Sequence, residues 1–353
     1  MKKSIYELSA EEKISWLKSH GHPSFRATQL SQWALKPGIT SFQQMKNLPT
    51  PLRQQLEAEF CLRNTQMVTH LGSPDDSAEK FLLRLSDGSC IETVLLHNDK
   101  GEHTVCVSTQ VGCAMKCVFC ASGMNGLVRN LSAHEILEQF LFVADHISVT
   151  HQSAGTANRL SHAVIMGMGE PLANLPNLLA ALKIVSAKDG LGISARKITI
   201  STAGLPDGIR LLATIKHPYH LAISLHAPSD SLRNELMPIN RKYGIHSVLD
   251  AATYYFHQTG RRVTYEYILI ADVNDSKIHA RQLCSLLKNQ NALINLIPFN
   301  PVESLDFRSP SQERIAQFSE ILKENGLSSV IRHRKGEKLE AACGQLRLHH
   351  LPK

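Results

Sequence analysis

Three cysteines lie close together in the sequence, at Cys113, Cys117 and Cys120. Two zinc knuckles would require paired C-x-x-C units, which this spacing does not provide. A [4Fe-4S] cluster held only by protein uses four thiolates, so three thiolates leave one iron without a protein ligand. Because a substrate or cofactor can bind at such an open position, the cysteines predict a reactive iron–sulfur site.

Other small and polar residues recur at the ends of predicted strands. Gly167, Gly169 and Glu170 follow HAVIM, Ser201 ends KITIS, Ser224-Leu225-His226 ends LAISLH, and Asn300 follows NLIPF. In βα barrels the active site is built at the carboxyl ends of the strands. These residues could therefore converge although they are distant in sequence.

Each of these residues also has an ordinary structural explanation. The glycine pair is typical of a tight turn, and Ser201 is typical of a helix cap. His226 at a strand end is usually a satisfied polar residue, and Asn300 before Pro301 is usually a turn residue. Only their recurrence at one structural position favours a cofactor site.

The five remaining cysteines differ in their surroundings. Cys106 alternates with Val105 and Val107, which is typical of a small buried core residue. Cys343 follows the basic run at 332–335, and neighbouring cations favour a reactive thiolate. Hydrophobic patterns surround the other three, which we interpret as core residues: Cys61, Cys90 and Cys284.

The pattern that must position these residues is an alternation of strands and helices. Strands are predicted at 162–167, 197–201, 220–225, 263–270, 292–297 and 328–332, and all but the last precede a helix-like segment. This α/β pattern indicates a parallel sheet or barrel. Residues 79–85 and 90–96 flank a Ser-Asp-Gly-Ser turn and predict a hairpin, HTVCVST predicts a further strand, and 151–161 predicts a loop.

Helix boundaries are signalled by capping residues. Ser9 with Glu12, and Ser132 with Glu135, form capping boxes. A second N-terminal helix is expected from 24 to 33. Three further boundary residues are Thr50 before Pro51, Asn174 before the helix near Pro176, and Gly326 after the last helix.

Length and composition are consistent with a folded protein of more than one unit. The chain has 353 residues, of which 43% are hydrophobic and 20% charged, so disorder is not expected. A net charge of +7 fits a polyanionic partner such as nucleic acid, although so modest a surplus is more often typical of a solvated surface alone. Cysteines clustered at one motif, with no signal peptide at MKKSIYELSAEE, predict a cytoplasmic location. No apolar run is long enough to span a bilayer, so we expect no membrane partner.

Several segments together resemble the RlmN and Cfr family of radical S-adenosylmethionine (SAM) RNA methyltransferases. They match in order and spacing over nearly the whole chain: CVSTQVGCAMKCVFC, GMGEPLAN, ITISTAG, LAISLHAP, LMPINRKY, VNDS, NLIPFNP and AACGQL. The resemblance implies a partial (β/α)6 TIM-like barrel. The implied units are an N-terminal helical RNA-binding domain at 1–75, a β-hairpin extension at 76–102, the barrel core at 103–348 and a short tail at 349–353.

The resemblance also implies a reaction that uses two SAM molecules. Cys343 would take a methyl group from the first, and a cluster on Cys113, Cys117 and Cys120 would cleave the second to a 5′-deoxyadenosyl radical. That radical would activate methylated Cys343 for addition to the adenine ring, giving a covalent protein–RNA intermediate. The remaining roles implied are a general base, Glu92, and a thiol that resolves the adduct through a disulfide with Cys343, Cys106. The implied SAM contacts are Gly169, Glu170, Ser201, Ser224, Leu225, His226 and Asn300.

Within the family, the motifs Glu170-Pro171 and Ile297-Pro298-Phe299-Asn300 are more similar to the RlmN branch. That branch methylates carbon 2 of an adenosine in 23S rRNA and of an adenosine in some tRNAs. The alternative is methylation of carbon 8, as in the Cfr branch. An electron donor such as flavodoxin or ferredoxin would be a further partner.

Two hypotheses from other classes remain open at this point. Cys106, Cys113, Cys117 and Cys120 could form a tetrahedral zinc site in a non-catalytic RNA-binding protein. A radical SAM enzyme with a small-molecule substrate would require neither the helical N-terminal domain nor Cys343.

Overall fold

A curved sheet of ten strands forms the centre of the computed structural model, which describes residues 2–98, 101–150, 159–215, 217–301 and 305–332. The strand order is β14-β13-β12-β11-β10-β9-β6-β5-β4-β3. In this sheet, the seven strands from β14 to β6 are mutually parallel. Their bounds are β6 Glu102–Cys106, β9 Arg159–Ile165, β10 Ile198–Thr202, β11 His220–Ser224, β12 Val263–Leu269, β13 Ala292–Pro298 and β14 Ser328–Ile331.

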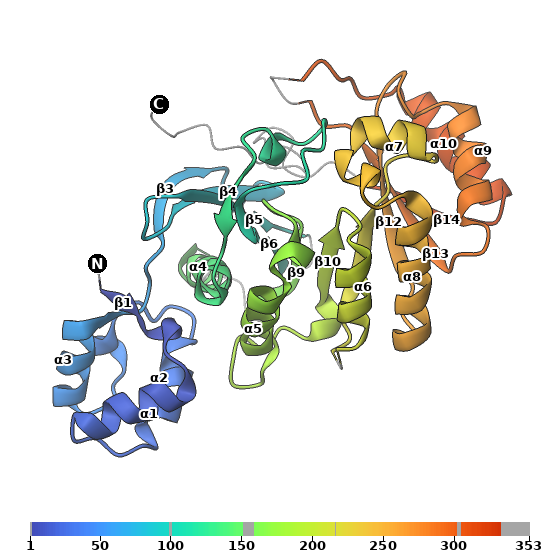
Figure 1. Cartoon of the computed structure of the whole chain (residues 1–353). Coiled ribbons are helices and arrows are strands. Elements are labelled where there is room, and N and C mark those ends of the chain that lie inside the picture. The colour runs from blue at the N-terminus through green and yellow to red at the C-terminus, as the bar shows by residue number, and fades with distance from the viewer. Residues whose placement is uncertain (1, 99–100, 151–158, 216, 302–304, 333–353) are drawn as a thin grey trace.

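Helices connect the parallel strands and cover the outer side of the sheet (Figure 1). Their bounds are α4 Ala133–Thr150, α5 Leu175–Ser186, α6 Pro206–Ala213, α7 Asp230–Leu236, α8 Ile245–Thr259, α9 Lys277–Leu287 and α10 Gln312–Glu324. The strand order has two ends, so the barrel is open. The predicted α/β class and partial barrel are confirmed, and the strand predicted at 328–332 is present as β14. None of the helices in the described ranges is both long and apolar enough to cross a membrane.

Three antiparallel strands extend the sheet beyond β6. They are β3 Gln66–Leu71, β4 Ala78–Arg84 and β5 Cys90–Leu96. The predicted hairpin is confirmed as β4 and β5, and Gly88 supplies the positive φ of 86° that its turn requires. β3 pairs with β4, so a boundary at residue 75 would separate two paired strands.

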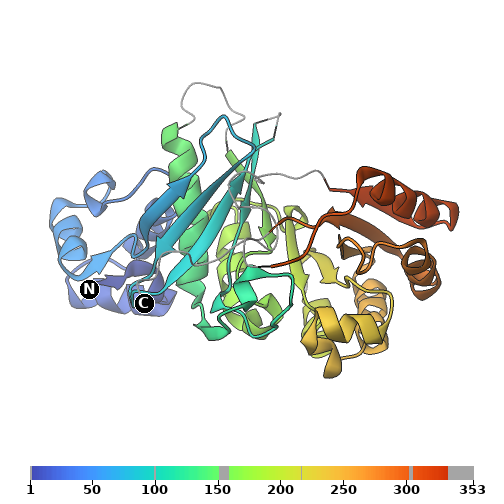
Figure 2. The ribbon, with the colours of Figure 1, turned by 90° about the horizontal axis from the view of Figure 1, so that it is seen from above.

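The N-terminal residues form a separate small core. Its elements are β1 Lys3–Ser4, α1 Ala10–Ser19, α2 Arg26–Ala34, α3 Thr50–Glu59 and β2 Phe60–Cys61. Leu17, Leu30, Phe42 and Leu56 are buried against one another in this core. Figure 2 shows this helical unit at one end of the molecule and α9 and α10 at the other.

One long helix, α4, joins the helical unit to the sheet. Its Glu138 accepts hydrogen bonds from the backbone of Asn64 and Thr65, at 3.0 and 2.9 Å. Its Asp145 binds the Arg63 guanidinium at 2.9 Å and the Gly38 amide at 2.8 Å. Charged side chains of α4 therefore fix the chain where it passes from the helices to β3.

Most boundary predictions hold, and two do not. Ser9 and Ser132 cap their helices with the expected glutamates, and Gly326 follows α10 with φ of 78°. Thr50 is not a cap, because α3 begins at Thr50 itself and Pro49, which has no side-chain acceptor, precedes it. Asn174 precedes α5 without capping its backbone, because its Oδ1 accepts from the Asn177 side-chain amide at 2.9 Å while its own amide donates to the Thr109 and Leu131 carbonyls.

The predicted loop at 151–161 is only partly described. Residues 151–158 lie outside the described residues, whereas 159–161 already belong to β9. The loop prediction was therefore wrong at its end, because β9 pairs with β6 from Arg159 onward.

Candidate active site

A cavity lies at the carboxyl ends of the parallel strands. Its lining includes these residues from the predicted set: Cys113, Cys117, Cys120, Gly169, Glu170, Ser201, Ser224 and His226. They come from the segments after β6 and β9 and from β10 and β11. The expected convergence at one end of the sheet is therefore confirmed as an arrangement in space.

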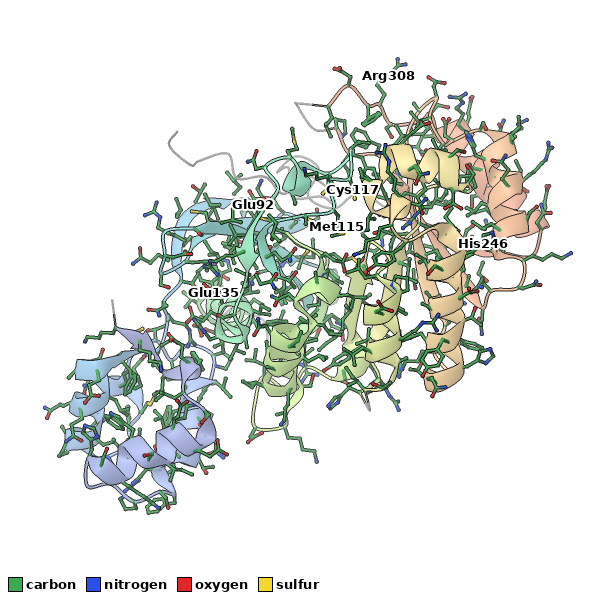
Figure 3. The ribbon with its side chains drawn as sticks, viewed as in Figure 1. Glu92, Met115, Cys117, Glu135, His246 and Arg308 are labelled. Carbon is green, nitrogen blue, oxygen red and sulfur yellow. The ribbon has the colours of Figure 1, made fainter. Side chains whose placement is uncertain are left out.

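The three cysteines lie on a loop that two short strands close at its base. β7 Gln110–Gly112 pairs with β8 Leu127–Asn130, and the Cys113 amide donates to the Gly126 carbonyl at 2.9 Å. Arg129 on β8 binds Glu135 at 2.8 Å, which fixes this pair of strands to the start of α4. In Figure 3, Cys117 and Met115 lie together at the strand ends, and Glu92 lies to their left on the antiparallel strands.

The three cysteines are partly buried. Burial raises the pKa of the Cys113 thiol to about 12 and the pKa of Cys117 well above its usual value. The isolated thiols are therefore protonated at neutral pH, and a metal that binds them must displace these protons.

A buried arginine beside the cysteines fits an anionic cluster. Arg233 on α7 is fully buried and donates to the carbonyls of Ala203, Ser224 and Leu225 at 2.6, 2.9 and 3.1 Å, and to Asn240 Oδ1 at 2.7 Å. All these acceptors are neutral, and burial lowers the pKa of Arg233 to about 10. Thiolates that ligate an iron–sulfur cluster would supply negative charge near this guanidinium. The residues present therefore fit the group.

Replacing Arg233 with methionine is expected to destabilise the protein by about 3 kcal/mol, because buried carbonyls at the ends of β10 and β11 lose their donor. Denaturant unfolding of both proteins measures this difference. The matched control is Arg308→Gln, which removes an arginine side chain that is 79% exposed and should change stability by less than about 0.5 kcal/mol. Equal losses in the two variants would contradict the role given to Arg233.

The two glycines after β9 are required by packing. A Cβ on Gly167 would lie 2.7 Å from the Ser108 amide nitrogen, and a Cβ on Gly169 would lie 2.5 Å from the Gln110 side chain. Gly169 also has a φ of 101°. The glycines therefore let this loop approach the segment after β6 and bring its backbone to the cavity wall.

The Glu170 carboxylate joins two of the strand ends. It accepts hydrogen bonds from the Leu172 amide at 2.9 Å, the Thr202 hydroxyl at 2.8 Å and the Ala203 amide at 2.7 Å. Burial raises the pKa of this carboxyl, and the three hydrogen bonds oppose that rise. Glu170 thus positions the β9 and β10 loops as well as lining the cavity.

His226 lies in the cavity wall in a fixed tautomer. Its backbone has a left-handed φ of 56°, and its Nδ1 accepts the Ile268 amide at 3.0 Å. Burial, with a smaller contribution from Arg233, lowers the pKa of His226 to about 3. The ring is therefore neutral with its proton on Nε2, which makes Nε2 a hydrogen-bond donor for a ligand.

The depressed pKa of His226 makes stability depend on pH. His226 binds a proton less readily in the folded protein than in the unfolded chain. The free energy of unfolding that is present above about pH 6.5 is therefore partly lost as the pH falls toward 3. At pH 5 the loss attributable to His226 is about 2 kcal/mol.

His226→Asn should remove that acid sensitivity, because asparagine tolerates positive φ but does not titrate in this pH range. Denaturant unfolding between pH 4.5 and 8 measures the effect. His246→Asn, at an exposed residue on α8, is the control. An unchanged pH dependence in His226→Asn would contradict this assignment.

Sequence reasoning missed several residues that line the cavity. Glu266 on β12 is 4% exposed, and Asn295 donates to its Oε1 at 3.0 Å. Within the described residues, Oε2 of Glu266 has no hydrogen-bond partner, and burial raises the pKa of this carboxyl. A lone acidic residue in the apolar strand VTYEYIL was the available signal. The other missed lining residues include Met115, Met166, Thr202, Met237, Ile297 and Arg332.

Four predicted site residues lie within the described part of the chain but do not line the cavity. Leu225 is buried behind the wall, where its amide donates to the Glu266 carbonyl at 3.0 Å, and Asn300 is buried beyond the end of β13. Cys106 is partly buried and packs against Val94 and Met168. The fourth, Glu92 on β5, lies 3.4 Å from Lys80 in a buried ion pair. Their assigned roles stay predictions.

Cys343 and the tail at 349–353 lie outside the described residues. The role predicted for Cys343 and its disulfide with Cys106 therefore stay predictions as well.

Comparison with known proteins identifies relatives along nearly the full chain. The profile of the Radical SAM superfamily matches residues 107–283, and that of the ribosomal RNA large subunit methyltransferase N-terminal domain matches residues 4–62. A probable dual-specificity RNA methyltransferase RlmN of Rhodopirellula baltica is 49% identical over 98% of this chain and 91% of its own length. The corresponding protein of Carboxydothermus hydrogenoformans is 44% identical over 98% of both chains.

A solved structure supports the same relationship. The crystal structure of a radical SAM methyltransferase from Sphaerobacter thermophilus superimposes with a TM-score of 0.91 at 40% identity, covering 98% of this chain and 99% of that chain. The shared fold therefore includes the helical unit, the antiparallel extension and the parallel strands.

Proposed function

Because the chain belongs to the RlmN family of radical SAM RNA methyltransferases, we propose that it methylates carbon 2 of a specific adenosine in 23S rRNA and an adenosine in some tRNAs. The observation that carries the proposal is the cavity that brings three cysteines to the strand-end residues Gly169, Ser201, Ser224 and His226. Ring carbons of adenine are too electron-poor for ordinary methyl transfer from SAM, so a cluster and a carrier are required.

We infer that residues around the cavity would hold both cofactors of the reaction. Cys113, Cys117 and Cys120 would hold a [4Fe-4S] cluster by three ligands, and His226 Nε2 and the Gly169 backbone would orient SAM. When bound, the cluster supplies the electron that cleaves SAM to a 5′-deoxyadenosyl radical. The full set of proposed SAM contacts is Gly169, Glu170, Ser201, Ser224, Leu225, His226 and Asn300.

Two cysteines that do not bind the cluster would take part in the methyl transfer: Cys343 would carry the methyl carbon, and Cys106 would release it from Cys343. The Cys343 thiolate would attack the methyl group of one SAM, forming a carbon–sulfur bond while the sulfonium bond breaks. A second SAM per turnover would supply the radical that abstracts a hydrogen atom from this methyl group, and the resulting methylene radical would add to the base. After the adduct has lost one electron to an oxidised redox partner and has lost the ring proton, the Cys106 thiolate would attack the Cys343 sulfur. A disulfide would form while the carbon–sulfur bond to the base breaks, and the released carbon would take up a proton to complete the methyl group. A thiol reductant would then reduce the disulfide and restore both cysteines.

Glu92 would remove the ring proton during this sequence. A base must be ionised to accept a proton, and the Lys80 ammonium 3.4 Å away favours the carboxylate form. Lys80 is thus a candidate positioning residue for the proposed base.

The helical unit would bind RNA. Its basic side chains include Arg26, Lys36, Lys46 and Arg53, and Lys36 lies over the Trp33 ring. The pairing of β3 with β4 supports an end of this unit near residue 62 rather than 75. We propose that the protein works in the cytoplasm and receives its electron from flavodoxin or ferredoxin.

Nucleoside analysis of treated RNA tests the proposal. Anaerobically reconstituted protein is incubated with unmodified 23S rRNA or tRNA, SAM and a reductant, and fragment mass spectra identify the methylated carbon. We expect 2-methyladenosine. Detection of 8-methyladenosine alone would support the carbon-8 alternative, and a colourless zinc-containing protein without activity would support the non-catalytic alternative.

A further inference from the structure

A cluster of histidines surrounds one buried carboxylate in the antiparallel part of the sheet. Glu79 on β4 is fully buried. Its Oε2 lies 2.7 Å from His70 Nε2 on β3 and 2.9 Å from His146 Nε2 on α4. Figure 1 shows that β3 and β4 lie close to α4, and none of these three residues lines the active-site cavity.

The three side chains present their ligating atoms to one another. The ligating atoms of His70, Glu79 and His146 all lie within 4.8 Å of each other. Two imidazole nitrogens and one carboxylate are a donor set that zinc binds, with an open fourth position. Ligand atoms around a tetrahedral zinc lie roughly 3.3 Å apart, so the two rings would withdraw by roughly half an ångström. Their partial exposure, 27% for His70 and 16% for His146, leaves room for this shift and for an outer ligand.

A further pair of histidines orients the carboxylate. His97 Nε2 lies 2.9 Å from Glu79 Oε1, and His97 Nδ1 lies 3.0 Å from His103 Nδ1. Because a carboxylate only accepts hydrogen bonds, the His97 proton is on Nε2, and its Nδ1 accepts from His103. The hydrogen bonds from His103 to His97 and from His97 to Glu79 occupy Oε1 and leave Oε2 facing His70 and His146. Hydrogen-bond partners behind a metal ligand commonly orient the ligand in this way.

We propose that His70, Glu79 and His146 form a second metal site that binds a divalent cation of the zinc class. The site is separate from the iron–sulfur cluster and does not depend on the proposed RNA chemistry. Its ligands come from β3, β4 and α4, so the metal would tie the largely exposed edge strand β3 to its neighbours. β3 directly follows the segment that leaves the helical unit, so the metal would stabilise that connection.

Metal analysis of the cluster-loaded protein tests this site. A loaded cluster prevents Cys113, Cys117 and Cys120 from taking up zinc themselves. After anaerobic incubation with zinc chloride and desalting, we expect about one zinc beside about four irons per chain, and a higher thermal unfolding midpoint than without zinc.

Single substitutions assign the zinc to its ligands. His70→Gln and His146→Gln should lose the zinc and the zinc-dependent rise in midpoint while keeping the iron. Both positions are partly exposed, so these variants avoid the folding defect expected from replacing the buried Glu79. His257→Gln, at an exposed histidine on α8, should behave as wild type.

Two results would overturn the proposal. One is a wild-type protein that retains no zinc after desalting. In that case His70, Glu79 and His146 form only a hydrogen-bond network. The other is zinc retained equally by wild type, His70→Gln and His146→Gln, which would place the metal elsewhere.

Discussion

Replacing Cys117 with serine is expected to remove the iron–sulfur cluster and abolish RNA methylation. Serine offers a hydroxyl of high pKa in place of a thiol that can lose its proton to iron. Cys117 lies in the cavity beside the other two cysteines. Iron content, visible absorbance and methyl transfer to RNA measure the effect.

Cys61→Ser provides the control for this experiment. Cys61 is on β2 in the helical unit, where its thiol donates to Asn64 Oδ1 at 2.8 Å, and it does not line the cavity. This variant should keep about four irons and normal methylation. A Cys117→Ser protein with a full complement of iron would contradict the assignment of the cluster ligands.

Replacing Cys343 with alanine is expected to abolish methylation while leaving the cluster in place. Alanine has no sulfur to accept a methyl group, so the carrier step is lost, whereas the three cluster ligands are untouched. Reductive cleavage of SAM should continue, because it requires only the cluster and bound SAM. Iron content, 5′-deoxyadenosine formation and RNA methylation separate these steps.

Cys90→Ala is the matched control, because Cys90 is a buried cysteine on β5 without a proposed role in the reaction. It should retain methylation if the fold is intact. Full turnover by Cys343→Ala would remove the carrier mechanism, although the cluster assignment would stand.

The sequence contained enough information to predict the site at the strand ends. Residues such as Ser201, Ser224 and His226 each follow or end a short apolar run, and parallel strands bring such positions to one edge of the sheet. Gly169 was predicted for its contact with a cofactor. The structure adds that packing against Gln110 also excludes a side chain there.

Residues whose importance depends on tertiary contacts could not be predicted in this way. Arg233 occurs in a polar helical segment typical of an exposed surface, yet it is fully buried against carbonyls from three other positions. Asn174 had a helix-capping context, but two carbonyls from distant segments satisfy its amide. Long-range hydrogen bonds override local preference in both cases.

The histidine cluster shows the same limit more strongly. His70, Glu79 and His146 lie on two strands and a helix, and no fixed spacing connects them in the sequence. Only the pairing of β3 with β4 and the packing of α4 bring these side chains together.

Isotope transfer from SAM tests the proposed reaction most directly. RNA is methylated with SAM that carries a fully deuterated methyl group, and both the methylated adenosine and the 5′-deoxyadenosine are analysed by mass spectrometry. Hydrogen abstraction from a methylated Cys343 predicts two deuteriums in the new methyl group and one in 5′-deoxyadenosine. Retention of all three deuteriums in the product, with none in 5′-deoxyadenosine, would contradict the radical carrier mechanism and indicate direct methyl transfer.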